Sequence, residues 1–154
     1  MGEPFVHWLR VRYAECDLQG VVFNAHYLAY FDTTLTELWR AAFGGYQAML
    51  DRGIDMVVAE AQLRFRAPAR FDEELELAVE IAQLGNTSIH SRHRIRRGGG
   101  AASPGRGDLL VEGEMRHVLV DRSTLAKTAI PDWVREGLAP WVLGAGGAGQ
   151  GDRS

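Results

Sequence analysis

Alternating apolar and polar residues predict five β-strands in this chain. The first strand is predicted at residues 5–13, where every second residue from Phe5 through Leu9 to Tyr13 lies on one face. In the second, residues 56–66, the same alternation assigns Val57 and Phe65 to the core face. The remaining strands are predicted at 74–83, 87–97 and 109–120.

Between the first two strands the apolar period changes to that of an α-helix. The helix is predicted from His26 to Phe43, with Asn24 at the N-cap and Gly44 at the stop. Tyr27 begins the main apolar face, but further apolar residues such as Leu28 lie off that face. A helix that is apolar on most sides is expected to be buried.

Short links between the last four strands, such as the turn at 85–86, are typical of an antiparallel sheet. A buried helix must be covered, and a sheet that curls around it can provide the cover. We therefore predict an α+β fold: a five-stranded antiparallel curved sheet wrapped around one long central helix. Residues 1–143 would form one domain, with a glycine-rich loop at 98–107, a short closing helix at 130–141 and a disordered tail at 144–154.

Composition narrows the possible partners and compartments. The chain has 154 residues and a net charge of -3, which argues against nucleic acid as the main partner. Its one cysteine, Cys16, excludes an intrachain disulfide and a multi-cysteine zinc site, and we predict no metal site. No secretory signal or long apolar run is evident, so we expect no membrane partner and a cytoplasmic location.

The link between the first strand and the helix contains the most informative residues. Asp17 and Gly20 precede an apolar segment at 21–23 that must be tucked inward. An aspartate in a loop is most often a turn residue, but here it would lie between apolar walls and a helix start. The free N–H groups of a helix start can polarise a carbonyl, while a carboxylate attacks it or activates water. Asp17 is therefore the predicted catalytic group.

The residues around Asp17 also form a motif that resembles one found in a known enzyme family. Asp17, Gly20, Val22 and Tyr27, in the pattern D-x-x-G-x-V-x-x-x-x-Y before a helix, resemble the hot-dog-fold acyl-CoA thioesterases of the 4-hydroxybenzoyl-CoA thioesterase type. The resemblance implies a hot-dog fold and hydrolysis of an acyl- or aroyl-CoA thioester to a carboxylic acid and free CoA. It implies no cofactor, because coenzyme A is part of the substrate. It covers roughly residues 5–140 and includes similar segments at 68–75, 85–88 and 118–121.

The resemblance also implies roles for single residues. Asp17 would be nucleophile or general base, the backbone N–H of Asn24 would polarise the thioester carbonyl, and Tyr27 would contact the substrate. Many members read Tyr-His-Ala-Asn-Tyr where this chain has Phe23-Asn24-Ala25-His26-Tyr27. The backbone N–H at position 24 is present whichever side chain stands there, so its implied role is unaffected by the exchange. His26 is predicted only as an accessory pocket residue.

Two groups of arginines are candidates for binding the phosphates of coenzyme A, because guanidinium groups bind phosphate bidentately. The alternative is a charged sheet edge that resists aggregation. The group around Pro68 is the better candidate and consists of Arg64, Arg66 and Arg70; the other lines the fourth strand with Arg92, Arg94, Arg96 and Arg97.

Two other functions remain open from the sequence: a non-catalytic acyl-CoA-binding module and a hot-dog dehydratase or hydratase. The sheet would also leave exposed edges and an uncovered outer face with Val58, Val118 and Val120, which predicts a homodimer. The resemblance adds that dimers pair again into homotetramers with active sites between subunits. Residues of one chain, near Glu60 or in the loop at Pro68, would then help to complete the pocket begun by Asp17 of another.

Overall fold

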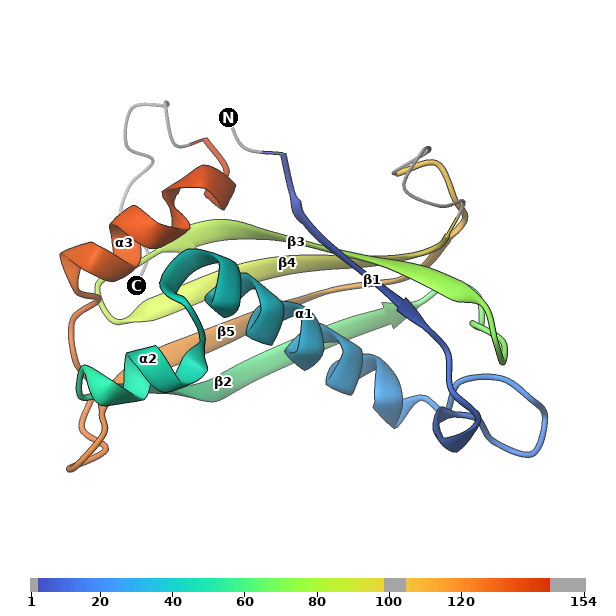
Figure 1. The fold of residues 1–154 in the computed structure, drawn as a ribbon, viewed down its shortest axis with the longest axis horizontal. Coiled ribbons are helices and arrows are strands. Elements are labelled where there is room, and N and C mark those ends of the chain that lie inside the picture. Colours follow the sequence, from blue (N-terminus) through green and yellow to red (C-terminus); the bar gives the residue numbers. More distant parts are fainter. Residues whose placement is uncertain (1–2, 99–104, 145–154) are drawn as a thin grey trace.

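The computed structural model of the chain describes residues 3–98 and 105–144 and contains one antiparallel five-stranded sheet in the order β1-β3-β4-β5-β2. The long helix α1 (Ala25–Phe43) lies across one face of this sheet (Figure 1). The predicted α+β architecture is therefore confirmed. The strands are β1 (Phe5–Arg10), β2 (Ile54–Phe65), β3 (Glu74–Leu84), β4 (Ser88–Arg97) and β5 (Leu109–Asp121).

The first strand is shorter than predicted. β1 ends at Arg10, and Tyr13 lies in a short 3₁₀ helix, η1 (Tyr13–Glu15). The strand stops because the backbone N–H of Arg12 donates to the Glu15 side chain at 2.8 Å, which closes a local turn. Tyr13 is consequently 82% exposed instead of facing the core.

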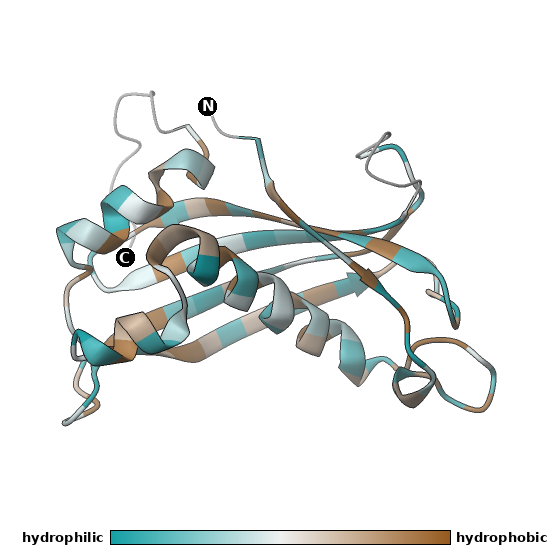
Figure 2. Cartoon of the chain, in the orientation of Figure 1, coloured by the Kyte–Doolittle hydropathy of each residue, from teal (hydrophilic) through white to brown (hydrophobic). Residues whose placement is uncertain are grey.

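Helix α1 is amphipathic rather than apolar on most sides, as its mixed colouring in Figure 2 shows. Its outward side includes Leu28, Asp32 and Thr36, all exposed. The prediction of a helix buried all round is thus wrong, because the sheet covers only one side of it. The buried side consists of Tyr27, Tyr30, Phe31, Thr34, Leu35, Leu38 and Trp39.

The predicted core face of β2 is wrong in the first half of the strand. The ladder with β5 shifts by one residue between Val58 and Glu60, and such a bulge reverses the in-and-out alternation. As a result Met56 and Leu63 both pack on the core, although they are seven positions apart and would lie on opposite faces of a regular strand. Val57, predicted to face inward, is 45% exposed.

Two valines predicted on an uncovered outer face are buried within the single chain: Val118 is 6% exposed and Val120 is 4% exposed. Val58, the third of that group, is 52% exposed. Exposed apolar surface is therefore found along β2, where Phe65 is also 53% exposed.

Two short helices complete the described structure. Helix α2 (Tyr46–Asp51) was not predicted, because six residues are too few to show a helical period. The predicted closing helix is α3 (Asp132–Leu138), followed by the 3₁₀ turn η2 (Ala139–Trp141). Most of the predicted loop at 98–107 and of the predicted tail at 144–154 lies outside the described residues. None of the helices in the described part of the chain is long and apolar enough to cross a membrane.

Candidate active site

Residues 15–23 form a small β-hairpin that joins η1 to the start of α1. Its two arms pair through the backbone: the N–H of Phe23 donates to the carbonyl of Glu15, and the N–H of Asp17 donates to the carbonyl of Val21. Gly20 closes the tip with a backbone φ of 76°, a conformation that favours glycine. The returning arm leads directly into α1, so Asp17 and the first turn of the helix belong to one short segment (Figure 1).

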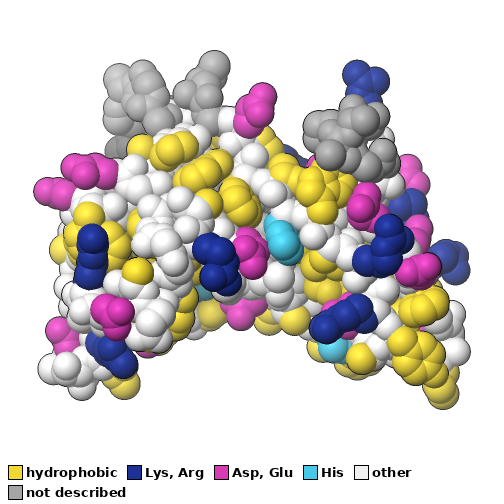
Figure 3. Space-filling model, viewed as in Figure 1, with side chains coloured by type: hydrophobic (Ala, Val, Ile, Leu, Met, Phe, Trp, Pro, Cys, Tyr) yellow, Lys and Arg dark blue, Asp and Glu magenta, His cyan; other side chains and the backbone are white. Residues whose placement is uncertain are grey.

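Asp17 lies exposed at the tip of this hairpin. Its Oδ1 accepts the backbone N–H of Gln19 at 2.8 Å, so it is a turn aspartate, but its carboxylate also borders a cavity of about 510 Å³. Apolar side chains gather at this end of the molecule (Figure 3). Large exposed apolar groups around a carboxylate are typical of a surface that a ligand or a partner covers. The cavity is lined by Tyr13, Cys16, Asp17, Leu18, Gly20 and Phe71.

The start of α1 offers unpaired backbone donors. In the described part of the chain no acceptor binds the backbone N–H of Asn24 or Ala25, whereas the N–H of His26 donates to the carbonyl of Phe23 at 2.8 Å. Free N–H groups and the helix dipole make such a start attractive to a developing negative charge. Asn24 occupies the N-cap position, as predicted, but it has helical backbone angles and its side chain makes no capping hydrogen bond.

Two of the predicted site residues next to this helix start serve mainly to hold structure. The ring of His26 is half-buried and packs edge-on against Phe23, with 6.4 Å between centroids. Tyr27 is 2% exposed, and its hydroxyl accepts the backbone N–H of Ala69 at 3.0 Å. The predicted direct contact of Tyr27 with substrate therefore does not suit this buried hydroxyl, which instead fixes α1 to residues 67–70.

Glu15 lies two residues before Asp17 at the base of the hairpin, and it is buried. Burial alone would raise the pKa of Glu15, but hydrogen bonds from the Arg12 backbone, the Tyr30 hydroxyl and the Arg12 side chain bring it below its usual value. Burial and the two flanking carboxylates raise the pKa of the Cys16 thiol. A protonated thiol is a poor nucleophile, which counts against Cys16 as a catalytic group.

The predicted arginine group is divided between two places. Arg64 and Arg66 project from the outer face of the sheet and pair with Glu112, at 4.0 and 2.6 Å. Arg70 lies beside the hairpin, bridged to Val21 by backbone pairing, and forms no ion pair within the described residues.

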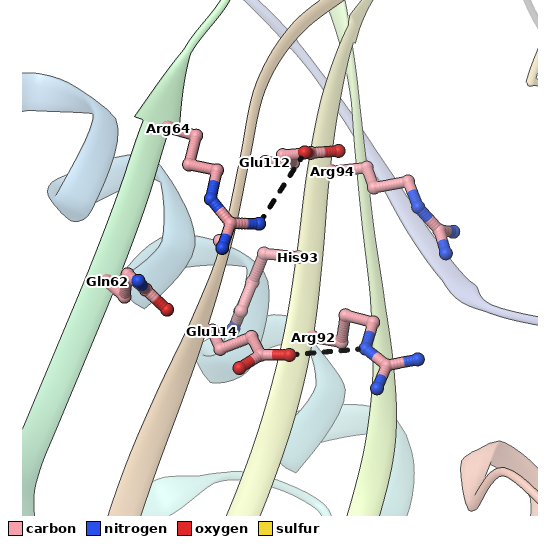
Figure 4. A pocket seen from close by; sticks show the side chains of 8 residues that line it. Gln62, Arg64, Arg92, His93, Arg94, Glu112 and Glu114 are labelled. Atoms are coloured by element: carbon pink, nitrogen blue, oxygen red, sulfur yellow. Dashed lines mark ion pairs between the residues drawn. The ribbon is translucent and has the colours of Figure 1, made fainter.

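Of the arginines on the fourth strand, Arg92 and Arg94 also have acidic partners, whereas Arg96 donates to the carbonyl of Gly107 at 3.1 Å. Figure 4 shows Arg64 directed toward Glu112 and Arg92 directed toward Glu114. Arg94 pairs with Glu80 at 3.0 Å. Since most of these guanidinium groups are already neutralised, the charged-sheet alternative suits this face better than a phosphate site. Glu60 is exposed on β2, and no contact joins it to the hairpin within the described chain.

Comparison with known proteins identifies the family. A family model for the thioesterase-like superfamily matches residues 11–138, most of the chain. The chain belongs to the thioesterase-like superfamily. The acyl-CoA thioester hydrolase YbgC of Escherichia coli O6:H1 is 31% identical over 132 residues, which make up 85% of this chain and 93% of that relative.

Solved structures place this thioesterase among hot-dog folds, as the sequence predicted. A hypothetical protein, TT1821, from Thermus thermophilus is 31% identical, with a TM-score of 0.77 over 90% of this chain and 98% of that one. The dynemicin thioesterase is 23% identical, with a TM-score of 0.81 over 92% of this chain and 99% of that one, and supports the fold alone.

The core of the thioesterase contains two buried histidines that sequence reasoning missed. His93 stacks on Phe31 with 4.3 Å between centroids, and burial lowers the pKa of His93 to about 3. Its Nε2 lies 2.9 Å from the hydroxyl of Ser91. His117, whose pKa burial also lowers, borders a second cavity together with Asp32. Both rings are neutral at pH 7, and the described residues contain no cluster suited to a metal ion.

Proposed function

We propose that this thioesterase hydrolyses an acyl- or aroyl-CoA thioester to a carboxylic acid and free CoA at the Asp17 hairpin. The observation that carries the proposal is the combination of an exposed carboxylate, a cavity with apolar walls and a helix start with unpaired N–H groups in one segment. The E. coli relative is named as an acyl-CoA thioester hydrolase, which favours coenzyme A as the leaving group.

The ionised carboxylate of Asp17 can act in either of two ways. As general base it takes a proton from water, whose oxygen attacks the carbonyl carbon; the C–S bond then breaks and the proton passes to the leaving sulfur. As nucleophile it bonds to the carbonyl carbon, expels the thiolate and forms an anhydride that water hydrolyses. In both routes the N–H of Asn24 stabilises the negative oxygen of the tetrahedral intermediate. We propose that no cofactor takes part.

Arg70 is the arginine best placed to hold a phosphate of coenzyme A. It lies next to the hairpin through its pairing with Val21, and no carboxylate of the described chain neutralises it. Arg64 and Arg66 would first have to release Glu112. A free guanidinium can bind phosphate without that loss, so Arg70 is preferred of the three.

Release of free thiol from a panel of acyl-CoA thioesters separates this function from the alternatives. We expect a chromogenic thiol reagent to report turnover on at least one short-chain, long-chain or aroyl-CoA substrate. A binding module would show saturable binding of the same thioesters with no thiol release. A dehydratase or hydratase would need a histidine paired with a carboxylate. His26 contacts Phe23 instead, and His117, which shares the second cavity with Asp32, forms no ion pair with it within the described residues.

Strand β2 favours a homodimer. It is an edge strand of 12 residues with exposed apolar side chains, Val57, Val58 and Phe65 among them. Unpaired edge strands readily pair with a second copy, and a two-fold dimer is the commonest closed assembly. We propose that β2 pairs across the two-fold axis, that Glu60 of one chain then approaches the Asp17 cavity of the other, and that two dimers can join as a homotetramer.

Light scattering on the active enzyme at micromolar concentration measures this assembly. We expect a mass of at least twice the 17.0 kDa of one chain. A mass of 17.0 kDa for fully active enzyme would contradict a site shared between two subunits.

A further inference from the structure

The hairpin that carries Asp17 is anchored by a buried carboxylate, that of Glu15. Glu15 is only 9% exposed, yet both oxygens of its carboxylate accept hydrogen bonds. Oε1 accepts the Arg12 backbone N–H at 2.8 Å and the Tyr30 hydroxyl at 3.0 Å, and Oε2 accepts the Arg12 guanidinium at 3.1 and 3.3 Å. A buried charge with this many donors is fixed in position, because losing any one of them would leave it partly unsatisfied.

Glu15 is also the residue at which the hairpin begins. Its carbonyl accepts the N–H of Phe23, and Asp17 lies two residues further along the same arm. Tyr30 projects from the second turn of α1 and is 3% exposed. In the described chain, Glu15–Tyr30 is the one side-chain hydrogen bond between the hairpin and α1. The bond therefore ties the arm that carries Asp17 to the helix whose start would bind the thioester carbonyl.

The opposite side of the hairpin reaches α1 only indirectly, through the segment before β3, whose Ala69 N–H donates to the Tyr27 hydroxyl at 3.0 Å. The N–H of Val22 donates to the carbonyl of Ala69, and the N–H of Phe71 donates to the carbonyl of Gly20. These bonds fix the hairpin to the segment before β3. Within the described chain, the direct side-chain tie from the hairpin to α1 is the Glu15–Tyr30 bond.

We propose that Glu15 and Tyr30 are positioning residues, whose hydrogen bond holds the Asp17 carboxylate at a fixed distance from the N–H groups at the start of α1. This inference rests on the proposed function. A shift of about 1 Å between reacting groups can cost about 10²-fold in rate. Tyr30→Phe removes only the hydroxyl and leaves the buried ring in place. We expect it to lower kcat about 10- to 100-fold, with KM changed less than about twofold.

Hydrogen exchange of the hairpin amides tests the same bond without reference to turnover. The N–H groups of Asp17 and Phe23 are both hydrogen-bonded in the hairpin. In Tyr30→Phe their exchange should accelerate about five- to tenfold, the amount expected for one lost hydrogen bond. Glu15→Gln should do the same, because the amide presents a donor to the Arg12 guanidinium. Ser91→Ala is the matched control, since it removes a buried hydroxyl bonded to His93 and Met115 in the sheet.

The proposal predicts that Tyr30→Phe and Glu15→Gln lose both kcat and hairpin protection, while Ser91→Ala keeps both. It also predicts that Tyr30→Phe has no further effect on kcat in an Asp17→Asn background. Unchanged hairpin exchange in both variants would overturn it, as would accelerated exchange with wild-type kcat. Wild-type turnover by Asp17→Asn would instead overturn the proposed function, because the exchange comparison still decides whether Glu15 and Tyr30 hold the hairpin.

Discussion

Replacing Asp17 by asparagine is expected to lower kcat by about 10²- to 10⁴-fold, because loss of a general base commonly costs this much and loss of a nucleophile can cost more. The substitution is close to isosteric. The Oδ1 of asparagine can still accept the N–H of Gln19, so the hairpin tip should keep its turn. Steady-state thiol release and circular dichroism on the purified variant measure the two expectations together.

Asp121→Asn is a matched control for this variant. Asp121 also lies in a turn and accepts backbone N–H groups, those of Ser123 and Thr124, through one Oδ1. It is far along the chain from the hairpin and borders neither cavity. We expect Asp121→Asn to keep wild-type turnover. A folded Asp17→Asn enzyme with most of the wild-type kcat would eliminate Asp17 as the catalytic carboxylate.

Replacing Asn24 by proline is expected to lower kcat by about 10²- to 10³-fold, the usual effect of removing one oxyanion donor. Proline deletes the backbone N–H and little else at this position. The φ of Asn24 is -49°, close to the value that proline imposes, and its N–H forms no bond within the described chain. The preceding residue, Phe23, lies in the paired arm of the hairpin, where proline can follow.

Asn24→Ala keeps the N–H and is the control. Because the Asn24 side chain makes no capping bond, its removal should change the free energy of unfolding by no more than about 0.5 kcal/mol. We expect kcat for Asn24→Ala to stay within about twofold of wild type. Equal kcat for correctly folded Ala and Pro variants would show that the backbone N–H of Asn24 takes no part in the reaction.

Much of the fold could be predicted because its signals are local. The change from a period of two to a period of 3.6 residues located α1 to within one residue, and Gly44 ends the helix with a left-handed φ of 88°. It was harder to predict which side chains of each helix and strand face the core. The bulge between Val58 and Glu60 leaves no mark in the alternation, so Val57 was assigned to the wrong face. Whether Leu28 is covered depends on how far the sheet curls, which no local pattern encodes.

In the candidate site, too, features that adjoin in the sequence could be predicted, whereas contacts between distant residues could not. Asp17 and Asn24 could be located from the sequence because the loop, the glycine and the helix start adjoin one another. The contact between Glu15 and Tyr30 spans 15 residues and two elements, so spacing alone could not reveal it. Likewise, Arg66 and Arg70 are near in sequence, but one pairs with Glu112 on the outer face and the other lies beside the hairpin.

The most direct test of the central claim, that Asp17 and the start of α1 act on one thioester, is a crystal structure of Asp17→Asn with intact acyl-CoA bound. We expect the thioester carbonyl oxygen about 3 Å from the backbone N of Asn24, in the range of oxyanion donors. We also expect the carbonyl carbon within about 3.5 Å of the residue-17 side chain, or one water away from it. A thioester carbonyl bound elsewhere, with the hairpin cavity empty, would show that Asp17 and the start of α1 do not act on it.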